Sequence, residues 1–231
     1  MKRINRPEWM DDPAATEADF EAALKDLEFL GRITFGARPT LAWLDALVKR
    51  TGATHLSVLD LGAGGGEMLR AVSAWGRRRG ITLDLTGLDR SPWAETYARA
   101  AGTEGNWLTC DLFDVPAEQK YDVILCSLFT HHLSDDEMVR FLRWLPQHAT
   151  LGWLISDVHR HWLPWIVLWA GTRLLRLAPM VIHDSTISIS RSFVREDLEG
   201  LIEHAGISAE LHWSFPFRWI VQGAPAAPTG R

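Results

Sequence analysis

Apolar residues recur at helical spacing through the first fifty residues of the chain. Thr16 and Asp19 resemble a capping box, so we expect one helix to start there, and Gly52 is placed to end a second helix that follows Pro39. The apolar positions are Phe20, Leu24, Leu27 and Leu30 in the first helix and Leu41, Leu44, Leu47 and Val48 in the second. The pattern predicts an N-terminal pair of amphipathic helices.

Beyond residue 54 the pattern changes to short apolar runs that alternate with helical segments. Five of these runs are typical of buried strands, namely HLSVLDLG, TLDLTGLD, WLTCD, YDVILCS and TLGWLISD. Ser91 with Pro92 is expected to open one intervening helix, and Ser134 with Glu137 forms a capping box for another. A helix closed by Gly206 and two last strands, SAELHWS and FRWIVQ, follow. This alternation predicts an α/β fold with a doubly wound, largely parallel sheet.

One stretch departs from this rhythm, the apolar segment HWLPWIVLWAGTRLLRLAPMVIHD from His161 to Asp184. A membrane span needs roughly 20 apolar residues, and here Arg173 and Arg176 interrupt the run. The segment also contains three helix-breaking residues that we expect to act as hinges: Pro164, Gly171 and Pro179. We therefore expect a buried or lid-forming helix that does not insert stably into a membrane.

The composition narrows the class of partner and the compartment. The chain has 231 residues, 47% of them hydrophobic, and a formal net charge of −5, which disfavours nucleic acid as the main partner. The N-terminal sequence MKRINRPEWMDDP has no apolar signal-peptide core, and the chain contains only two cysteines, Cys110 and Cys126. These features predict a cytoplasmic protein with reduced thiols.

The loops after the first three strands hold the residues that suggest chemistry. The run Asp-Leu-Gly-Ala-Gly-Gly-Gly, residues 60–66, joins the first strand to its helix, where glycines let a ligand approach backbone N–H groups closely. Asp89 ends the second strand and Asp111 follows the third. All of these positions lie at the carboxyl ends of strands, the edge where open α/β sheets bind ligands.

These motifs, together with YDVILCSLFTHHL at the fourth strand, make residues 55–222 resemble the class I S-adenosylmethionine-dependent methyltransferases. The resemblance implies a seven-stranded sheet of order 3-2-1-4-5-7-6 with strand 7 antiparallel. In that order Cys110 and Cys126 would lie three strands apart, roughly 14 Å, whereas a disulfide needs Cα atoms within about 7 Å. The resemblance therefore implies free thiols and S-adenosyl-L-methionine as the cofactor.

Carried over by position, the family's cofactor site falls on nine residues of this chain. The glycine loop would face the amino acid part of the cofactor with Asp60 supporting it, Asp89 would bind the ribose, Asp111 and the Leu112 amide would bind adenine, and Ser127 would lie beside the methionine part. The full set of expected cofactor residues is Asp60, Gly62, Gly64, Gly66, Asp89, Arg90, Asp111, Leu112 and Ser127. A nicotinamide-binding loop would instead need a glycine where Glu67 stands, which disfavours an oxidoreductase.

Catalysis is expected after strands four and five. His131 and His132 follow the fourth strand and Asp157 ends the fifth, and some small-molecule O-methyltransferases of this class resemble this arrangement. We expect His131 to act as a general base that Asp157 orients, with His132 as a second catalytic candidate. No metal site is expected, because the histidines lack a thiolate or carboxylate cluster at ligand spacing.

The specificity of such enzymes comes from additions to the sheet, and two are expected here. The predicted organisation is a helical cap over residues 1–53, a methyltransferase domain over 54–222 with a lid insert at 159–190, and a disordered tail at 223–231. The lid and the helices at 17–50 would enclose the acceptor, and these residues would line it: Trp162, Trp165, Trp169, Met180 and His183.

The function that follows is O-methylation of a hydrophobic or aromatic small molecule, such as a phenol, polyketide or quinol, in a biosynthetic pathway. C-methylation, N-methylation, another S-adenosylmethionine-dependent reaction or a non-catalytic binding subunit stay open as alternatives. The short segments RPEWMDDP and SISRSF are similar to those of bacterial methyltransferases of secondary metabolism. We expect a monomer or homodimer whose partner is the small-molecule acceptor.

Overall fold

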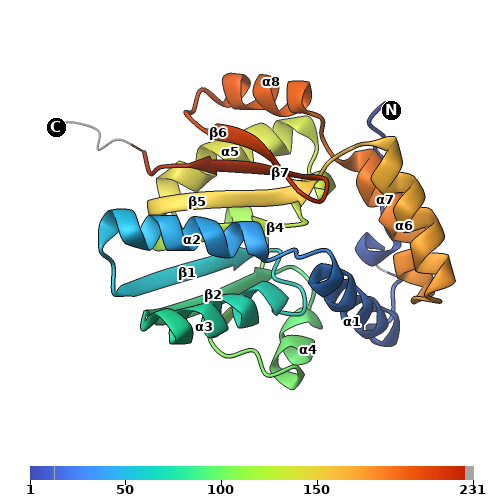
Figure 1. Ribbon diagram of the computed structural model, residues 1–231, viewed down its shortest axis with the longest axis horizontal. Coiled ribbons are helices and arrows are strands. Elements are labelled where there is room, and N and C mark those ends of the chain that lie inside the picture. Colours follow the sequence, from blue (N-terminus) through green and yellow to red (C-terminus); the bar gives the residue numbers. More distant parts are fainter. Residues whose placement is uncertain (13, 227–231) are drawn as a thin grey trace.

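The apolar runs of the sequence form seven strands of one sheet in the computed structural model, which describes residues 1–12 and 14–226 (Figure 1). The strands are β1 His55–Leu61, β2 Thr82–Asp89, β3 Asn106–Thr109, β4 Tyr121–Ser127, β5 Ala149–Val158, β6 Glu210–Ser214 and β7 Arg218–Gly223. Their order is β3-β2-β1-β4-β5-β7-β6, and β7 pairs antiparallel with both β5 and β6. The expected fold class and strand order are confirmed.

Helices separate the strands at the positions that the helical periodicity indicates. The α-helices are α1 Glu17–Ile33, α2 Arg38–Thr51, α3 Glu67–Arg79, α4 Ala94–Ala100, α5 Asp135–His148, α6 Trp162–Leu174, α7 Pro179–Arg191 and α8 Arg195–Ala205, and the 3-10 turns are η1 Trp9–Asp11, η2 Leu112–Asp114 and η3 Thr130–His132. Thr16 caps α1 and the box of Ser134 with Glu137 caps α5, as expected. In contrast, α4 begins at Ala94 rather than Pro92, because the Ser91 side chain accepts the Trp93 N–H within a turn.

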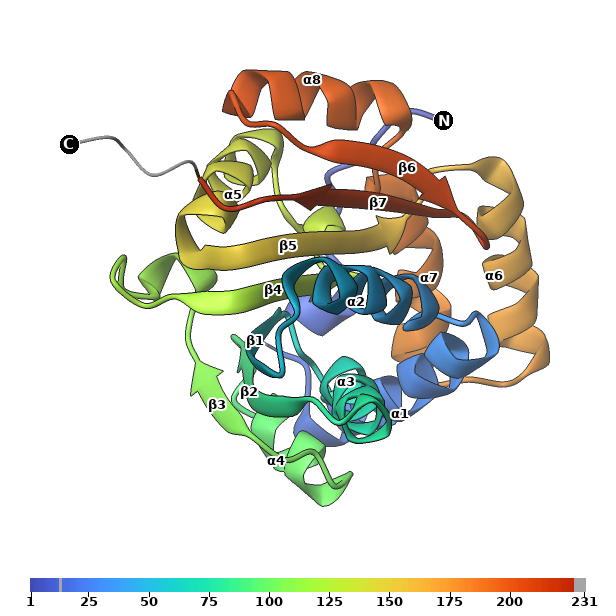
Figure 2. The same ribbon diagram turned by 60° about the vertical axis from the view of Figure 1, so that its left-hand side comes forward.

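Two apolar clusters hold the helices against the sheet. Helices α5 and α8 cover one face, where Phe141, Leu142 and Trp153 are fully buried, and α2 and α3 cover the other, where Leu44 and Leu47 are buried (Figure 2). The two expected N-terminal helices therefore occupy different places. Helix α2 belongs to a layer that packs on the sheet, and α1 lies beyond the strand ends with its Leu24 against the glycine loop.

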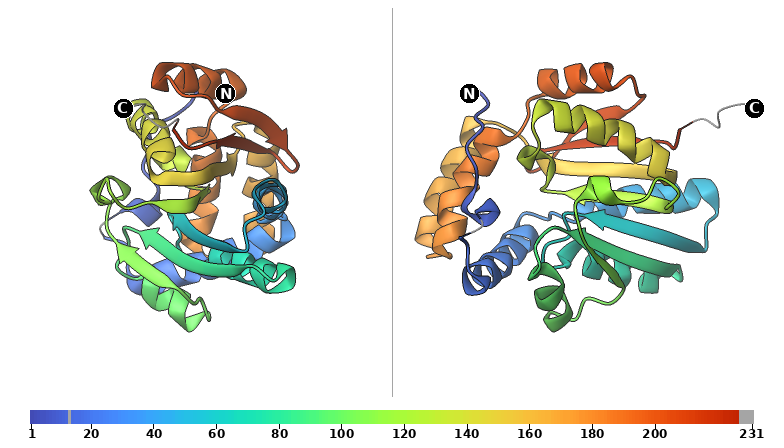
Figure 3. Two further views of the ribbon diagram at one scale, coloured as in Figure 1. Left: turned by 90° about the vertical axis from the view of Figure 1, so that its left-hand side faces the viewer. Right: turned by 180° about the vertical axis from the view of Figure 1, so that it is seen from behind.

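Helices α1, α6 and α7 gather beyond the carboxyl ends of the parallel strands, as the views from both sides show (Figures 1 and 3). The apolar segment after β5 forms two helices, with Pro179 as the first residue of α7. Pro164 and Gly171, which we expected to act as hinges, lie inside a continuous α6, because a proline in the first turn of a helix removes no hydrogen bond that the helix needs. Among the described residues, no helix combines the length and the apolar character that crossing a membrane requires.

Both cysteines are free thiols, Cys126 in β4 and Cys110 just after β3, with β2 and β1 between those strands. Gly223 is the last residue of β7 and the Ala226 N–H donates to the Pro146 carbonyl. The rest of the tail expected at 223–231, residues 227–231, lies outside the described residues.

Candidate active site

The glycine loop between β1 and α3 adopts a backbone that only glycine accepts comfortably. Gly62, Gly64 and Gly66 have φ values of 67°, 48° and 71°. A Cβ atom at Gly62 would lie 2.7 Å from the Phe129 ring, and one at Gly66 would lie 2.5 Å from the Thr103 hydroxyl. The loop is thus held tightly between α3 and the segment that follows β4.

Asp89 joins this loop to the end of β2. Its Oδ2 accepts the Gly64 N–H at 2.8 Å and its Oδ1 accepts the Ser91 N–H at 2.8 Å. Burial raises the pKa of Asp89. Burial, followed by the nearby charges of Asp89 and Glu67, also raises the pKa of Asp60 to about 8. The buried Asp60 and the half-buried Asp89 therefore lie beside the loop, and no cationic side chain lowers the pKa of Asp60. Such an environment is suited to a positively charged ligand.

The remaining expected cofactor residues lie along the same edge of the sheet. Asp111 caps the η2 turn by accepting the Phe113 N–H at 2.9 Å, and Leu112 is buried behind it. Ser127 ends β4, and its hydroxyl is buried without a hydrogen-bond partner among the described residues. Arg90 is exposed and turns toward Asp11, 3.9 Å away, on the N-terminal segment. A buried hydroxyl such as that of Ser127, unpartnered within residues 1–12 and 14–226, is available to a ligand.

His131 and Asp157 form a close pair at the ends of β4 and β5. His131 Nδ1 lies 2.8 Å from Asp157 Oδ1, and Asp157 Oδ2 accepts the Thr130 hydroxyl and the His131 N–H at 2.6 and 3.1 Å. Burial alone would raise the pKa of Asp157, but the charge and hydrogen bonds of His131 and the Thr130 bond hold it below its ordinary range. An ionised carboxylate only accepts, so His131 Nδ1 donates to Asp157 and the Nε2 atom on the other side of the ring points away from that carboxylate.

The N-terminal segment covers the two histidines, a feature that the spacing of sequence motifs did not reveal. Glu8 is buried, with Oε1 3.7 Å from His131 Nε2 and Oε2 3.8 Å from His132 Nε2. Asp11 Oδ2 lies 2.9 Å from His132 Nδ1. Burial raises the pKa of Glu8 to about 7. The only sequence signal for these acids is the acidic segment EWMDD, which carries no information about its distance from His131.

Two further residues that the sequence analysis missed hold this segment in place. Asp184 on α7 accepts the N–H groups of Trp9 and Met10 at 2.9 and 3.0 Å. Arg191, at the end of α7, donates to the carbonyls of His131 and His132 at 2.9 and 2.8 Å. Helix α7 therefore positions both the histidine pair and the segment that covers it.

The five expected acceptor-lining residues are not brought together into one wall. Trp162 and Trp169 on α6 are 57% and 46% exposed, and Trp165 is partly buried. Met180 packs with Ala23 between α7 and α1, and His183 stacks on Trp9 with ring centroids 3.9 Å apart and contacts Asp184. The apolar face of α6 is thus exposed, and the two residues of α7 contact the N-terminal segment and α1.

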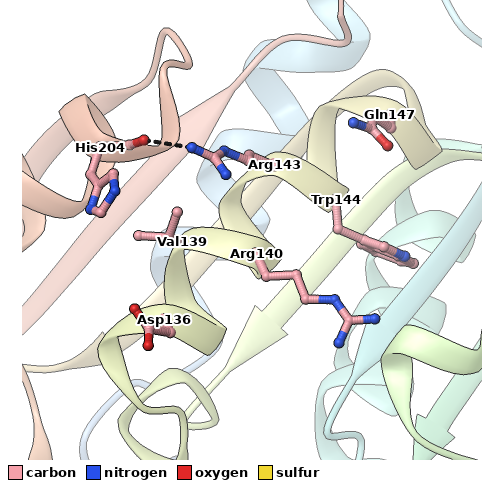
Figure 4. A pocket seen from close by; sticks show the side chains of 7 residues that line it. All are labelled: Asp136, Val139, Arg140, Arg143, Trp144, Gln147 and His204. Carbon is pink, nitrogen blue, oxygen red and sulfur yellow. Dashed lines mark hydrogen bonds between the residues drawn. The ribbon is translucent and has the colours of Figure 1, made fainter.

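Two hollows on the surface lie away from the expected site. One, of about 400 Å³, lies between α5 and α8, where Arg143 donates to the His204 carbonyl (Figure 4). The other, of about 840 Å³, lies between α1, α2 and α3 and includes Glu67 next to the glycine loop. Neither hollow is lined by any of the expected site residues.

Comparison with known protein families finds one match within the chain. Residues 58–150 match the family model described as "Methyltransferase domain", a range that includes the glycine loop, Asp89, Ser127 and both histidines. No curated protein sequence matches the chain. The match identifies a methyltransferase domain within the chain, which is the class that the sequence motifs resemble, and such a domain implies S-adenosylmethionine as the cofactor.

Solved structures share the fold at low sequence identity. The plantazolicin methyltransferase BpumL, with a desmethylplantazolicin analogue and S-adenosylhomocysteine bound, is 16% identical with a TM-score of 0.67, covering 91% of this chain and 96% of that one. Magnesium protoporphyrin IX methyltransferase from Synechocystis PCC 6803 is 18% identical with a TM-score of 0.55, covering 84% and 83%. A candidate O-methyltransferase from Nostoc punctiforme PCC 73102 is 17% identical with a TM-score of 0.59, covering 88% and 59%.

Proposed function

We propose that this methyltransferase transfers a methyl group to a hydroxyl of a hydrophobic or aromatic small molecule, and that loss of the hydroxyl proton depends on His131. The observation that carries this proposal is the buried pair of His131 Nδ1 with Asp157 Oδ1, 2.8 Å apart, at the cofactor edge of the sheet. A hydroxyl must lose its proton to become a good nucleophile, and a positioned group that assists contributes about 10²–10⁴-fold. A buried, oriented imidazole suits that requirement.

The position of the pair supports the same reaction. The Phe129 ring packs at Gly62 on the glycine loop and stacks on His132, with ring centroids 6.4 Å apart, so the histidines lie next to the proposed cofactor site. In the transfer step an acceptor oxygen forms a bond to the methyl carbon, the carbon–sulfur bond breaks, and its electron pair stays on sulfur. The protein contributes mainly alignment of the two reactants, which can be worth roughly 7–11 kcal/mol.

We assign the cofactor to the residues at the carboxyl ends of β1 to β4. Gly62, Gly64 and Gly66 would face the methionine part, Asp89 the ribose, and Asp111 with the Leu112 amide the adenine. The buried hydroxyl of Ser127 supports its place beside the methionine part, because it lacks a partner among the described residues. The buried, uncompensated Asp60 supports a place near the cofactor's cationic groups.

We assign the acceptor to the region covered by residues 1–33 and by the insert 159–190, with helix α2 and residues 54–222 as the catalytic domain. Helix α2 packs on the sheet and so belongs to the catalytic body rather than to the cap. The exposed apolar side chains of α6, including Trp162 and Trp169, support an apolar acceptor. The two free cysteines fit a cytoplasmic reaction.

The test is methyl transfer from labelled S-adenosylmethionine to a panel of phenols and hydroxylated polyketides, with His131→Ala and His204→Ala compared. His204 is an exposed residue of α8 and serves as a matched control. His131→Ala should lower turnover by about 10²-fold or more, with cofactor affinity near that of the wild type. Full turnover in a folded His131→Ala protein, or methylation at carbon or nitrogen, would contradict the proposal.

A further inference from the structure

Glu8, His131 and His132 bring three potential metal-ligand atoms within 4.8 Å of one another. Glu8 Oε1 is 3.7 Å from His131 Nε2, and Oε2 is 3.8 Å from His132 Nε2, so neither contact is a hydrogen bond. Two metal–ligand bonds of roughly 2.0–2.2 Å, the lengths of zinc bonds to imidazole and carboxylate, span up to about 4 Å. The separations therefore match atoms that share a metal ion.

Both histidines are oriented as metal ligands usually are. Asp157 Oδ1 lies 2.8 Å from His131 Nδ1, and Asp11 Oδ2 lies 2.9 Å from His132 Nδ1. Each carboxylate oxygen can accept a hydrogen bond from the Nδ1–H of its histidine. The Nε2 atom of each ring is then on the side of Glu8. A histidine that ligates a metal commonly donates its other ring N–H to a carboxylate in this way.

The charge around the cluster is also suited to a cation. Glu8 is 4% exposed and Asp184 and Asp157 are 6% and 4% exposed. Two buried cations oppose these acids, Arg191 beside Asp11 and Arg218 near Asp157. A carboxylate that faces two nitrogen lone pairs repels them unless a proton or a metal ion lies between. The His132 side chain is 20% exposed, so one side of the cluster is accessible to solvent.

We propose that Glu8, His131 Nε2 and His132 Nε2 bind one divalent first-row transition-metal ion. Two imidazoles and one carboxylate suit zinc, manganese or iron(II), and they disfavour magnesium, which prefers oxygen ligands. The ion ties the N-terminal segment to the turn η3 after β4. Three protein ligands leave at least one coordination position open.

The role of the ion deepens the proposed O-methylation and rests on it. A hydroxyl acceptor that takes the open position loses its proton to water on binding, because a divalent ion lowers the pKa of a bound oxygen. The bound oxygen then attacks the methyl carbon, the carbon–sulfur bond breaks, and S-adenosylhomocysteine leaves. In this route the transfer depends on His131 as a ligand of the ion, and its Nε2 does not take the proton.

Metal binding is tested first, without reference to activity. Protein freed of metal by chelation is titrated with Zn²⁺ by calorimetry and analysed for metal content after dialysis. We expect one ion per chain and a loss of affinity of more than about 100-fold in Glu8→Gln and in His132→Ala. Asp11→Asn, which removes the negative charge beside His132 Nδ1 and beside Arg191 Nη1, should weaken binding by about 10–100-fold.

The matched control is His212→Ala, an exposed histidine of β6, which should bind Zn²⁺ as the wild type does. Substitution with Co²⁺ gives a visible spectrum that distinguishes nitrogen and oxygen ligands from the thiolates of Cys110 and Cys126. Equal Zn²⁺ binding by the wild type and Glu8→Gln, absence of binding, or a Co²⁺–thiolate spectrum would each overturn the site.

Activity then separates this inference from the proposed function. If metal-free protein is inactive and Zn²⁺ or Mn²⁺ restores methyl transfer, the ion acts on the acceptor. If metal-free wild type keeps full turnover while His131→Ala loses it, the ion's role is overturned and O-methylation with His131 as a direct base stands. If Zn²⁺ binds but the product is methylated at carbon or nitrogen, the proposed O-methylation fails and the metal site stands.

Discussion

At the scale of single residues, Asp89 uses both carboxylate oxygens to bind backbone N–H groups, one at Gly64 in the glycine loop and one at Ser91 after β2. It therefore shapes the loop, and in the proposed cofactor site it also offers a carboxylate to the ribose. An amide at this position has one acceptor atom in place of two, and its NH₂ group would face an N–H donor.

We predict that Asp89→Asn lowers affinity for S-adenosylmethionine by roughly 10- to 150-fold, the equivalent of about 1.5–3 kcal/mol for a charge-assisted hydrogen bond. Calorimetric titration with the cofactor measures the loss. Asp84→Asn is the matched control, because Asp84 lies on the same strand with its side chain 67% exposed. Equal affinities of the two variants would remove Asp89 from the cofactor site.

The candidate site was predictable from sequence only where its residues follow strands. His131 and Asp157 each come after an apolar run, and the carboxyl ends of neighbouring parallel strands meet at one edge, so their contact could be expected. Glu8 and Asp11 lie in a segment without periodicity, and Arg191 lies at the end of α7. Their contacts with the histidines come from chain packing at long range, which no local pattern encodes.

At the scale of elements, the strands and most helices followed the sequence pattern because burial and capping act locally. The burial of the apolar insert could not be predicted in the same way, because its composition does not distinguish a buried helix from one that exposes its apolar side. In α6 the side chains of Ile166, Val167 and Leu174 are 47%, 57% and 83% exposed, while Pro164 and Thr172 are buried against the rest of the protein. Such a surface is costly in water unless it has a partner.

We predict that amide hydrogens of α6 exchange fast in the free enzyme and slow down when S-adenosylhomocysteine and an acceptor are both bound, because the acceptor covers the apolar face. Exchange mass spectrometry over Trp162–Leu174 measures this change. Helix α5, with its capping box and buried apolar face, is the internal control and should be protected in every state. Slow exchange of α6 in the free enzyme would show that it is ordinary scaffold.

At the scale of the whole molecule, the proposed site lies at one edge of the sheet, and α1, α6, α7 and the N-terminal segment lie beyond that edge. The strand order could be anticipated because the motifs resemble a known class, and alternating strands and helices alone leave several orders open. The placement of α2 on the sheet could not be anticipated, because the apolar side of this helix could pack under a lid or against a sheet equally well. Which surface an amphipathic helix meets depends on the complete fold.

The buried carboxyl groups beside the glycine loop have a consequence for the stability of the entire fold. Burial raises the pKa of Asp60 to about 8 and that of Glu67 to about 7. In the unfolded chain both would titrate near about 4. Between these values the folded protein binds more protons than the unfolded one, so the free energy of unfolding is highest at low pH and falls as the pH rises through 7 and 8. Asp157 has a lowered pKa in the folded state, so its contribution to the free energy of unfolding rises with pH, and it does so only below about pH 4.

We therefore predict that the cofactor-free protein is more stable toward urea at pH 5 than at pH 8. Where Asp60 is protonated in the folded protein and ionised in the unfolded chain, it changes the free energy of unfolding by at most about 1.4 kcal/mol for each pH unit. Asp60→Asn, which resembles the neutral acid, should flatten this dependence, since the folded protein no longer has to keep a proton on that side chain. Glu104→Gln, at an exposed position between α4 and β3, should leave the slope as it is in the wild type. Urea unfolding followed by tryptophan fluorescence at several pH values measures all three proteins. A wild-type profile as flat as that of Asp60→Asn would mean that Asp60 is ionised throughout, with a cation beside it that the geometry of the loop does not account for.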